Sequence, residues 1–398
     1  MNSYLDALGL VCALGQGRTA VAEALAAGRS AGMQAQAGWI KDQRVTVGAV
    51  LGELPPVPAE LADQDTRNNR LLLAAALQIE ETLRAAREHF GAGRIGVVLG
   101  TSTSGIQESS QGIAGLVNQG ALPPEYSYLH QELCAPAEFL ARWLQLQGPC
   151  YAISTACTSS ARALHSARRL LRAGVCDAVI CGGVDSLSHL TLNGFHALEA
   201  LSPAHCNPFS ANRQGINIGE GAAVFLMTRE PFQRTTRPIG LLGAGASSDA
   251  HHISAPDPAG RGALAGMQAA LRDAGLDAAQ IDYVNLHGTA TRHNDAMESL
   301  AVQQLFPAGV PCSSSKPLSG HTLGAAGALE AAFCWLSLDS QDGGLPPHLW
   351  DGETDPALAA LPFVTAGQRL PADRPRRLMS NSFAFGGSNA SLILGDLA

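Results

Sequence analysis

Three residues of this chain carry side chains suited to carbonyl chemistry: Cys157, His287 and His321. Cys157 lies within GPCYAISTACTSSARALHSARRLLRAG, where a short apolar strand meets an amphipathic helix. The free N–H groups and the dipole at the start of such a helix stabilise a thiolate, the form of cysteine that attacks a carbonyl carbon. The sequence therefore predicts that Cys157 accepts an acyl group.

The two histidines lie in separate small-residue turns, NLHGTATRHNDAMES and KPLSGHTLGAAG. A lone cysteine is more often an inert buried thiol, and a lone histidine near glycines is more often structural. Two histidines that each follow a predicted buried element, together with a cysteine at a strand-to-helix turn, favour a reaction site instead. Neutral imidazoles there would donate hydrogen bonds to an oxyanion that develops on a second substrate.

The elements around Cys157 follow from the hydrophobic periodicity. Apolar residues from Ala163 to Leu171 keep helical spacing and most arginines fall elsewhere, which predicts a surface-facing helix with a buried stripe. Upstream, the run 66–90 predicts one long helix that opens with Arg67 and Arg70, which face solvent unless an acidic group meets them. Residues 40–60 are rich in proline and predict irregular structure, and residues 106–147 have the mixed character of an insertion.

Composition limits the classes of function. With 398 residues, 46% of them hydrophobic, the chain can bury a large core. A net charge of −8 without a long basic run argues against nucleic acid as the main partner. Nine cysteines without a CxxC pair favour reduced thiols and a cytoplasmic location, and the apolar start of the chain is interpreted as a first strand, with no membrane span.

The order of the motifs repeats along the chain. A buried strand with a Gly-Thr turn, a turn followed by a helix, and a glycine cluster followed by a strand occur once before residue 229 and again after it. This pattern predicts a divergent duplication with halves at 1–229 and 230–398, stacked α/β layers, and functional loops that meet where the halves join.

Four ordered motifs resemble those of the β-ketoacyl-acyl carrier protein synthases, the elongating condensing enzymes of fatty acid and polyketide synthesis. They are STACTSS, HGTATxxND, KxxxGHTLGAAG and NSFAFGGSNA, and the resemblance covers essentially the whole chain. It implies a thiolase-like fold with two pseudo-equivalent halves in a five-layer αβαβα arrangement. It also implies decarboxylative condensation of an acyl group on Cys157 with malonyl-carrier to give β-ketoacyl-carrier and CO2.

The resemblance assigns roles to further residues. His287 and His321 would bind the malonyl thioester and stabilise the enolate, with Lys316 and Glu298 as a supporting ion pair. Phe385 would form the oxyanion hole with the Cys157 backbone and, with Phe383 and Ala384, the gate to the acyl pocket. The other implied positions are pantetheine contacts at Thr289 and Thr291, carrier docking at Arg67 and Arg70, and a structural monovalent cation at Asn285 and Glu330.

The resemblance also implies the partners. No cofactor of the enzyme's own is expected, because the phosphopantetheine belongs to the acyl carrier protein. The expected assembly is a homodimer or a heterodimer with a chain-length-factor-like subunit. A degradative thiolase would carry a second catalytic cysteine near the C-terminus, where this chain has none, and a non-catalytic partner subunit would lack Cys157.

Three positions depart from the family pattern. Ala290 replaces a usual Gly or Ser, Ser210 stands where Asp is usual, and Ala384 replaces the common Gly beside the gating phenylalanine. A Cβ at a hinge limits backbone conformations, so we expect altered gate opening. The RNNRLLLAA and LGTSTSG segments look more like synthases of specialised clusters, such as those that make aryl polyenes.

Overall fold

The strands of the first half carry the elbow that holds Cys157. In the computed structural model, which describes residues 3–232 and 237–397, they lie in the order β6-β5-β7-β8-β1. Strands β5, β6 and β7 are parallel, and β8 is antiparallel to both β7 and β1. The bounds are β1 (Tyr4–Cys12), β5 (Ile95–Gly100), β6 (Cys150–Ile153), β7 (Ala178–Asp185) and β8 (Gly221–Thr228).

The second half repeats this arrangement strand for strand. Its order is β11-β10-β12-β13-β9, again with three parallel strands followed by two antiparallel ones. The bounds are β9 (Ile239–Ser248), β10 (Tyr283–Asn285), β11 (Cys312–Ser313), β12 (Arg377–Phe383) and β13 (Ser388–Asp396). The two sheets meet at the pair Tyr4–Gly240. The predicted duplication and the pseudo-equivalent halves are therefore confirmed, while the boundary at 229–230 stays a prediction; it falls between the end of β8 and the start of β9.

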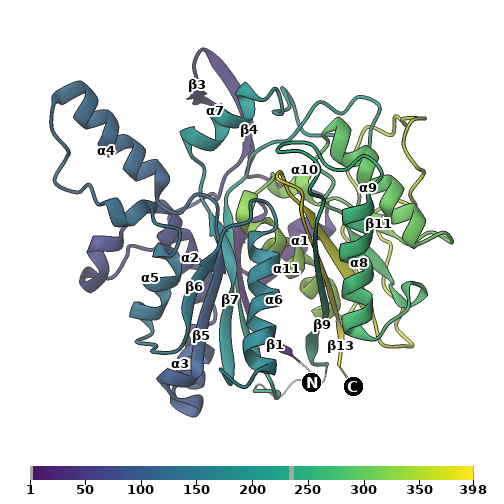
Figure 1. Ribbon diagram of the computed structural model, residues 1–398, viewed down its shortest axis with the longest axis horizontal. Helices are drawn as coiled ribbons and strands as arrows, with labels where there is room; N and C mark the ends of the chain where they lie inside the picture. Colours follow the sequence, from purple (N-terminus) through teal and green to yellow (C-terminus); the bar gives the residue numbers. More distant parts are fainter. Residues whose placement is uncertain (1–2, 233–236, 398) are drawn as a thin grey trace.

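Helices cover both sheets and separate them, which gives five layers (Figure 1). Helices α2 (Arg67–Leu77) and α5 (Ala135–Trp143) lie on the outer face of the first sheet, and α8 (Arg261–Ala274) with α9 (Arg292–Leu305) lie outside the second. Helices α6 (Ser159–Arg172) and α11 (Ala326–Asp339) form the middle layer. This is the predicted αβαβα arrangement.

The middle layer explains why α11 is apolar on every side. Its residues from Ala326 to Leu338 are all buried, as expected for a helix between two sheets. Helix α6 also lies there, so its prediction as a surface-facing helix is wrong. Arg168 of α6 is buried and forms an ion pair with Asp273 of α8, an interaction that no periodicity in the sequence indicates.

Several shorter elements complete the fold. The predicted long helix at 66–90 is two helices, α2 and α3 (Glu80–Phe90), because the backbone leaves helical geometry at Ile79 (φ −125°). Part of the region 40–60, predicted to be irregular, belongs to a hairpin of β3 (Met33–Ile40) and β4 (Gln43–Gly48). One further strand is β2 (Gly15–Gln16), and three further α-helices are α1 (Arg18–Ala26), α7 (His189–Ala197) and α10 (Lys316–Ser319).

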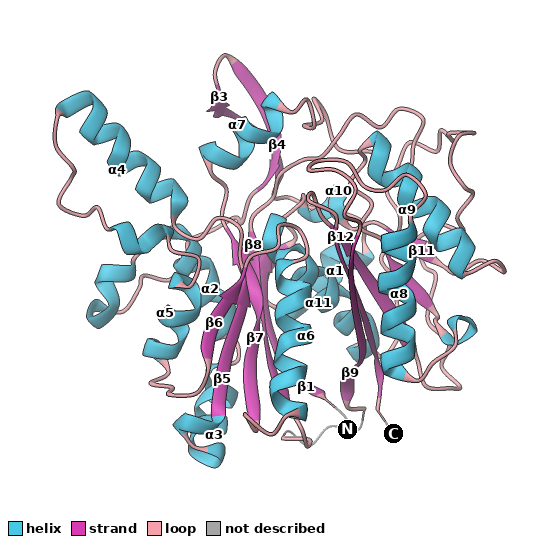
Figure 2. Ribbon diagram, in the orientation of Figure 1, coloured by secondary structure: helices cyan, strands magenta, loops and turns pink. Residues whose placement is uncertain are grey.

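The predicted insertion at 106–147 is a helical excursion. Helix α4 (Ile106–Gln119) projects from the body of the molecule on the side of the first sheet (Figure 2). Among the described residues, no helix is long and apolar enough to cross a membrane.

Candidate active site

A strained turn presents Cys157. After β6 ends, Ala156 adopts a left-handed conformation (φ 52°), which is unfavourable for a residue with a Cβ, and Cys157 follows just before α6. The Ser159 hydroxyl donates to Ala156 O (2.5 Å) and accepts from Thr155 N (2.9 Å), so the helix start holds the turn. The strand-to-helix elbow predicted from the sequence is confirmed.

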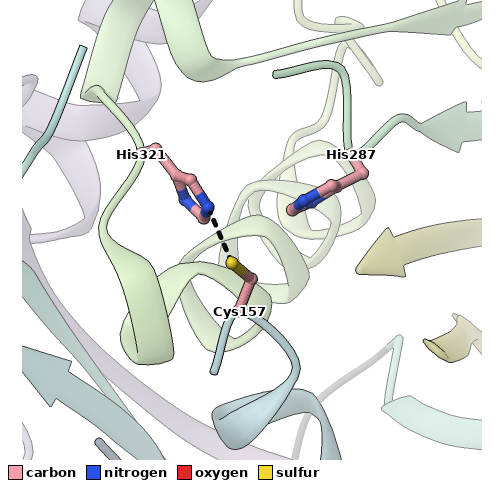
Figure 3. Close-up of side chains that lie close together, drawn as sticks. All are labelled: Cys157, His287 and His321. Carbon is pink, nitrogen blue, oxygen red and sulfur yellow. Dashed lines mark hydrogen bonds between the residues drawn. The ribbon is translucent and has the colours of Figure 1, made fainter. Parts of the chain in front are cut away.

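The two histidines meet at the sulfur of Cys157 (Figure 3). His287 follows β10, and His321 follows α10, so both come from the second half. The Nε2 atom of His321 lies 3.0 Å from Sγ of Cys157. The rings of His287 and His321 lie edge to face with centroids 5.3 Å apart, and the sulfur and one nitrogen of each ring all lie within 4.8 Å of one another. Such a donor set could also hold a soft metal ion.

Burial sets the charge states of this cluster. It lowers the pKa of both imidazoles well below the usual value, and the positive charge of Lys316 lowers it further, so both rings are neutral near pH 7. Burial also raises the pKa of the Cys157 thiol to about 11, although Lys316 and the backbone N–H groups of Phe385 and Cys157 oppose the shift. The thiolate predicted from the helix dipole is therefore wrong for this conformation, because desolvation outweighs the dipole.

The ion pair beside the histidines is formed by a different acid from the predicted one. Lys316 binds Glu330 of α11 (2.5 Å) and donates to the backbone oxygen of His287. Glu298 of α9 instead accepts hydrogen bonds from the backbone N–H of His287 and of Gly288, both at 2.7 Å. The predicted Lys316–Glu298 pair is therefore wrong: Glu298 fixes the turn that carries His287, and Lys316 holds that turn from its other side.

The turn between β12 and β13 closes over the sulfur. The backbone N–H groups of Phe385 and of Cys157 both lower the pKa of the Cys157 thiol. They are the pair of donors expected for an oxyanion hole. The Phe385 ring packs against Phe195 of α7 (centroids 5.7 Å apart), a contact that the sequence did not indicate. Phe383 lies edge-on to His287, with centroids 6.1 Å apart.

Ala384 fits this turn without strain. The left-handed conformations fall on Gly386 (φ 82°) and Gly387 (φ 75°), and Ala384 is not among the residues with positive φ. Ala384 N donates to Ser388 O (2.8 Å) and Gly387 N to Ala384 O (3.0 Å). Ala384 therefore keeps an ordinary backbone conformation here, and its effect on gate opening stays a prediction.

A pocket of about 770 Å³ connects the cluster with the surface. Cys157 and both histidines lie at its wall, and so do Thr289 and Thr291, whose hydroxyls are 2.9 Å apart. The two threonines therefore lie along the route by which a thioester would reach the sulfur.

Arg67 and Arg70 each meet an acidic side chain, the exception that the sequence analysis allowed. Arg67 forms an ion pair with the buried Glu220, and Arg70 forms one with Asp65 (2.5 Å). Their side chains remain 41% and 42% exposed, yet each guanidinium group is already paired with a carboxylate of this chain. Carrier docking at these residues stays a prediction, and the structure gives it less support than the sequence did.

Two of the remaining predicted positions share a common feature. Asn285 Oδ1 and Glu330 Oε2 are buried oxygens without a hydrogen-bond partner among the described residues. Hard cations prefer such oxygen ligands, so both residues fit the predicted monovalent cation, although Glu330 also neutralises Lys316. These residues would hold the ion if it binds.

The two other departures from the family pattern are accommodated by neighbouring groups. Ala290 takes a left-handed conformation (φ 61°), which explains why glycine is common there, and its carbonyl accepts from Gly215 N (2.9 Å). The Ser210 hydroxyl donates to Asp351 (2.8 Å).

Comparison with known proteins decides the family. The chain matches the beta-ketoacyl synthase N-terminal domain over residues 8–232 and the C-terminal domain over residues 240–349. The chain belongs to the β-ketoacyl synthase family. Nodulation protein E of Rhizobium meliloti (strain 1021) is 32% identical over 98% of this chain and 97% of its own length. The 3-oxoacyl-[acyl-carrier-protein] synthase 2 of the same strain is 38% identical over 63% of this chain and 61% of its own.

A solved structure agrees with this membership. A chain of the structure described as "Ketosynthase (ApeO) in Complex with its Chain Length Factor (ApeC) from Xenorhabdus doucetiae" superimposes with a TM-score of 0.94. It is 47% identical in sequence, and the match covers 100% of this chain and 98% of that one. The fold is therefore that of a ketosynthase, as the sequence motifs predicted.

Proposed function

We propose that this condensing enzyme carries an acyl group on Cys157 and extends it by decarboxylative condensation with a malonyl thioester. The observation that carries the proposal is the convergence of one thiol, two neutral imidazoles and two backbone donors at the inner end of a single pocket. A nucleophile and donors for two separate oxyanions are what the two half-reactions require.

In the first half-reaction, Sγ of Cys157 attacks the carbonyl carbon of an incoming acyl thioester. His321 Nε2, at 3.0 Å, is in position to take the thiol proton as the new C–S bond forms. The N–H groups of Cys157 and Phe385 stabilise the tetrahedral oxyanion. The pantetheine sulfur then leaves with the proton, so the step exchanges one thioester for another.

In the second half-reaction, a malonyl thioester loses its carboxylate as CO2, and its thioester oxygen gains negative charge as an enolate. The neutral ring of His287 donates a hydrogen bond to that oxygen, and so does His321 once its ring proton lies on Nε2. The enolate carbon then attacks the acyl carbonyl on Cys157, and the C–S bond breaks. The product is a β-ketoacyl thioester, and the sulfur regains one proton from solvent.

Two other readings have less support. A degradative thiolase needs a second catalytic cysteine near the sulfur, and among the described residues the thiol cluster contains Cys157 with two histidines. A non-catalytic chain-length subunit has no nucleophile, whereas Cys157 lies in a formed elbow here.

The proposal also covers the substrates and the assembly. We propose acyl carrier proteins as thioester donors, whose pantetheine arm would reach Cys157 through the pocket that Thr289 and Thr291 line. We propose a dimer, either of two copies or with a chain-length-factor-like subunit, since the solved neighbour pairs a ketosynthase with such a factor. The RNNRLLLAA and LGTSTSG segments support a specialised product such as an aryl polyene, and nine free cysteines support a cytoplasmic location.

The intact mass of the protein after incubation with a panel of acyl carriers tests this function. We expect the mass of one acyl group to add to the wild type and none to Cys157→Ala. Cys206→Ala provides a matched control, because Cys206 is another buried thiol and lies outside the pocket. Equal labelling of wild type and Cys157→Ala would refute the assignment of the nucleophile.

A further inference from the structure

The carboxylate of Asp185 is buried and, among the described residues, forms no salt bridge. Asp185 is the last residue of β7, and it is 0% exposed. Its hydrogen bonds come from hydroxyls and backbone N–H groups. A carboxylate that loses its water without gaining a cation is costly, so these hydrogen bonds have to compensate for the lost hydration. The groups that bind Asp185 therefore show what it holds in place.

One oxygen of Asp185 holds the turn that follows β5. Oδ1 accepts from the hydroxyls of Thr101 and Thr103 (both 2.7 Å), and from the N–H groups of Ser102 (2.8 Å) and Thr103 (2.7 Å). The Ser102 N–H also lies 3.1 Å from Oδ2. Three consecutive residues of the first half therefore fold around one carboxylate.

The other oxygen reaches the second half, at the turn that carries His321. Oδ2 accepts from the N–H of Gly324 (2.5 Å), three residues after His321. The turn is tight, because Leu323 has a left-handed conformation (φ 51°). A Cβ at Gly324 would lie 2.7 Å from Oδ2 of Asp185 and 2.8 Å from Ser102 N, so the two turns are packed too closely for a side chain. Asp185 thus ties the turn after β5 to the turn after His321.

The His321 ring depends on this backbone for its orientation. Its Nε2 atom lies 3.0 Å from Sγ of Cys157 (Figure 3). Among the described residues, Nδ1 of His321 has no hydrogen-bond partner, so no second hydrogen bond fixes the ring. The backbone N–H of His321 itself donates to Asn217 O (2.7 Å). The residues that follow His321 are held by the hydrogen bond from Gly324 to Asp185.

We propose that Asp185 is a positioning residue, which keeps Nε2 of His321 within reach of the Cys157 sulfur. The inference rests on the proposed function, because it assumes that His321 takes the thiol proton during acylation. Glu298 plays the matching part for His287, whose backbone N–H it binds at 2.7 Å. Each imidazole of the site is therefore held by a buried carboxylate that binds the backbone of its turn. A displacement of the ring by about 1 Å is enough to slow the reaction severely.

The single-turnover rate of Cys157 acylation tests this role. Asp185→Asn keeps the shape of the side chain, but its NH2 group must face either the Gly324 N–H or the donors of the turn after β5. We expect the rate at saturating acyl thioester to fall about tenfold, the scale of one lost hydrogen bond to a buried charged group. The thioester concentration that gives half of this rate should not change, because the pocket wall at Thr289 and Thr291 keeps its contacts.

The same change in a His321→Ala background separates positioning from a general loss of structure. If Asp185 acts through His321, Asp185→Asn should slow acylation no further once the imidazole is gone. Thr103→Val repeats this cycle with a milder change, because it removes one hydroxyl donor to the carboxylate and keeps the side-chain shape. It should slow acylation about threefold, again only when His321 is present, and it serves the test if Asp185→Asn does not fold.

Asp282→Asn is a matched control. The side chain of Asp282 is 3% exposed, binds Arg374, and precedes β10 at the end away from His287. Its replacement should lower the melting temperature, because it also disturbs a buried carboxylate, and it should leave the acylation rate unchanged.

Two results would overturn the role of Asp185 while leaving the proposed function intact. One is an unchanged acylation rate in both Asp185→Asn and Thr103→Val. The other is an equal loss of rate with and without His321, which would show that Asp185 supports the Cys157 elbow instead. If no thioester acylated Cys157 of the wild type, the proposed function itself would fail, so the two failures are distinguishable.

Discussion

The two histidines of the site are not equivalent. His321 contacts the Cys157 sulfur directly, whereas the backbone around His287 is held by Glu298 and Lys316. Both rings can reach an enolate, yet His321 alone is close enough to take part in acylation as well. This asymmetry follows from the three-dimensional placement of two turns that look alike in the sequence.

Replacing each histidine by alanine separates these roles. Both variants should lower decarboxylation of a malonyl thioester by about a hundredfold, because each removes an oxyanion donor. His321→Ala should also slow acylation of Cys157 by at least about tenfold, since it removes the base beside the thiol, and His287→Ala should not. CO2 release and single-turnover acylation measure the two steps, and identical acylation rates in the two variants would refute the asymmetry.

The raised thiol pKa predicts how Cys157 reacts with alkylating agents. A thiol with a pKa near 11 is protonated at neutral pH, and the reactive thiolate appears only as the pH rises toward that value. Labelling by iodoacetamide, followed by mass spectrometry, should therefore increase steadily between pH 7 and about pH 10. A plateau below pH 8 would instead indicate the depressed pKa that the helix dipole suggested.

At the scale of elements, the turn between β12 and β13 is the part of the site best suited to move. It supplies the Phe385 N–H and ring, and two glycines carry its left-handed conformations. Ala384 does not have a positive φ, and its backbone N–H and carbonyl each form one hydrogen bond within the turn. Its Cβ therefore favours the present conformation by removing alternatives, in line with the restricted backbone conformations that we expected from the sequence.

Ala384→Gly should loosen this turn. Glycine adds conformations at a position where alanine fits, so the present state should lose up to about 1 kcal/mol, or about fivefold in population. We expect faster acylation with long acyl carriers and little change in decarboxylation on a pre-acylated enzyme. Pre-steady-state acylation measures the effect, and unchanged rates for short and long chains would contradict it.

At the scale of the whole molecule, the helical excursion leaves apolar side chains in solvent. Val117 is 77%, Tyr128 63% and Leu129 57% exposed, and all three lie between the start of α4 and the start of α5. The edge strand β6 lies on the same side of the molecule (Figure 2). Exposed apolar residues and an unpaired sheet edge on the same side of a molecule are both typical of a protein interface.

Negative charges introduced at this surface should therefore prevent the protein from forming a dimer. The double variant Val117→Asp and Leu129→Asp should elute as a monomer, whereas the wild type, or its mixture with a chain-length-factor-like subunit, should elute as a dimer. Val175→Asp offers a control, since Val175 is 44% exposed, follows the C-terminal end of α6 and lies outside the excursion. Size-exclusion chromatography with light scattering measures the mass, and an unaltered dimer in the double variant would place the interface elsewhere.

The family, the duplication, the cysteine elbow and the three residues of the reacting cluster were all predictable from the sequence. Short-range signals encode these features: hydrophobic runs, glycine turns and motifs of a few residues each. Strands β5, β7 and β8 were recognisable because their residues are buried on both faces and apolar throughout.

Which charged side chains pair with one another could not be predicted without the three-dimensional fold. Lys316 pairs with Glu330 and not Glu298, and this contact joins two separate helices, α10 and α11. Arg67 pairs with Glu220 and Arg213 with Asp355, and these contacts join segments far apart in the sequence. The charge state of Cys157 also depended on burial, because desolvation by the surrounding layers outweighs the local helix dipole. Pairing and desolvation arise from packing between distant segments, and no local pattern contains that information.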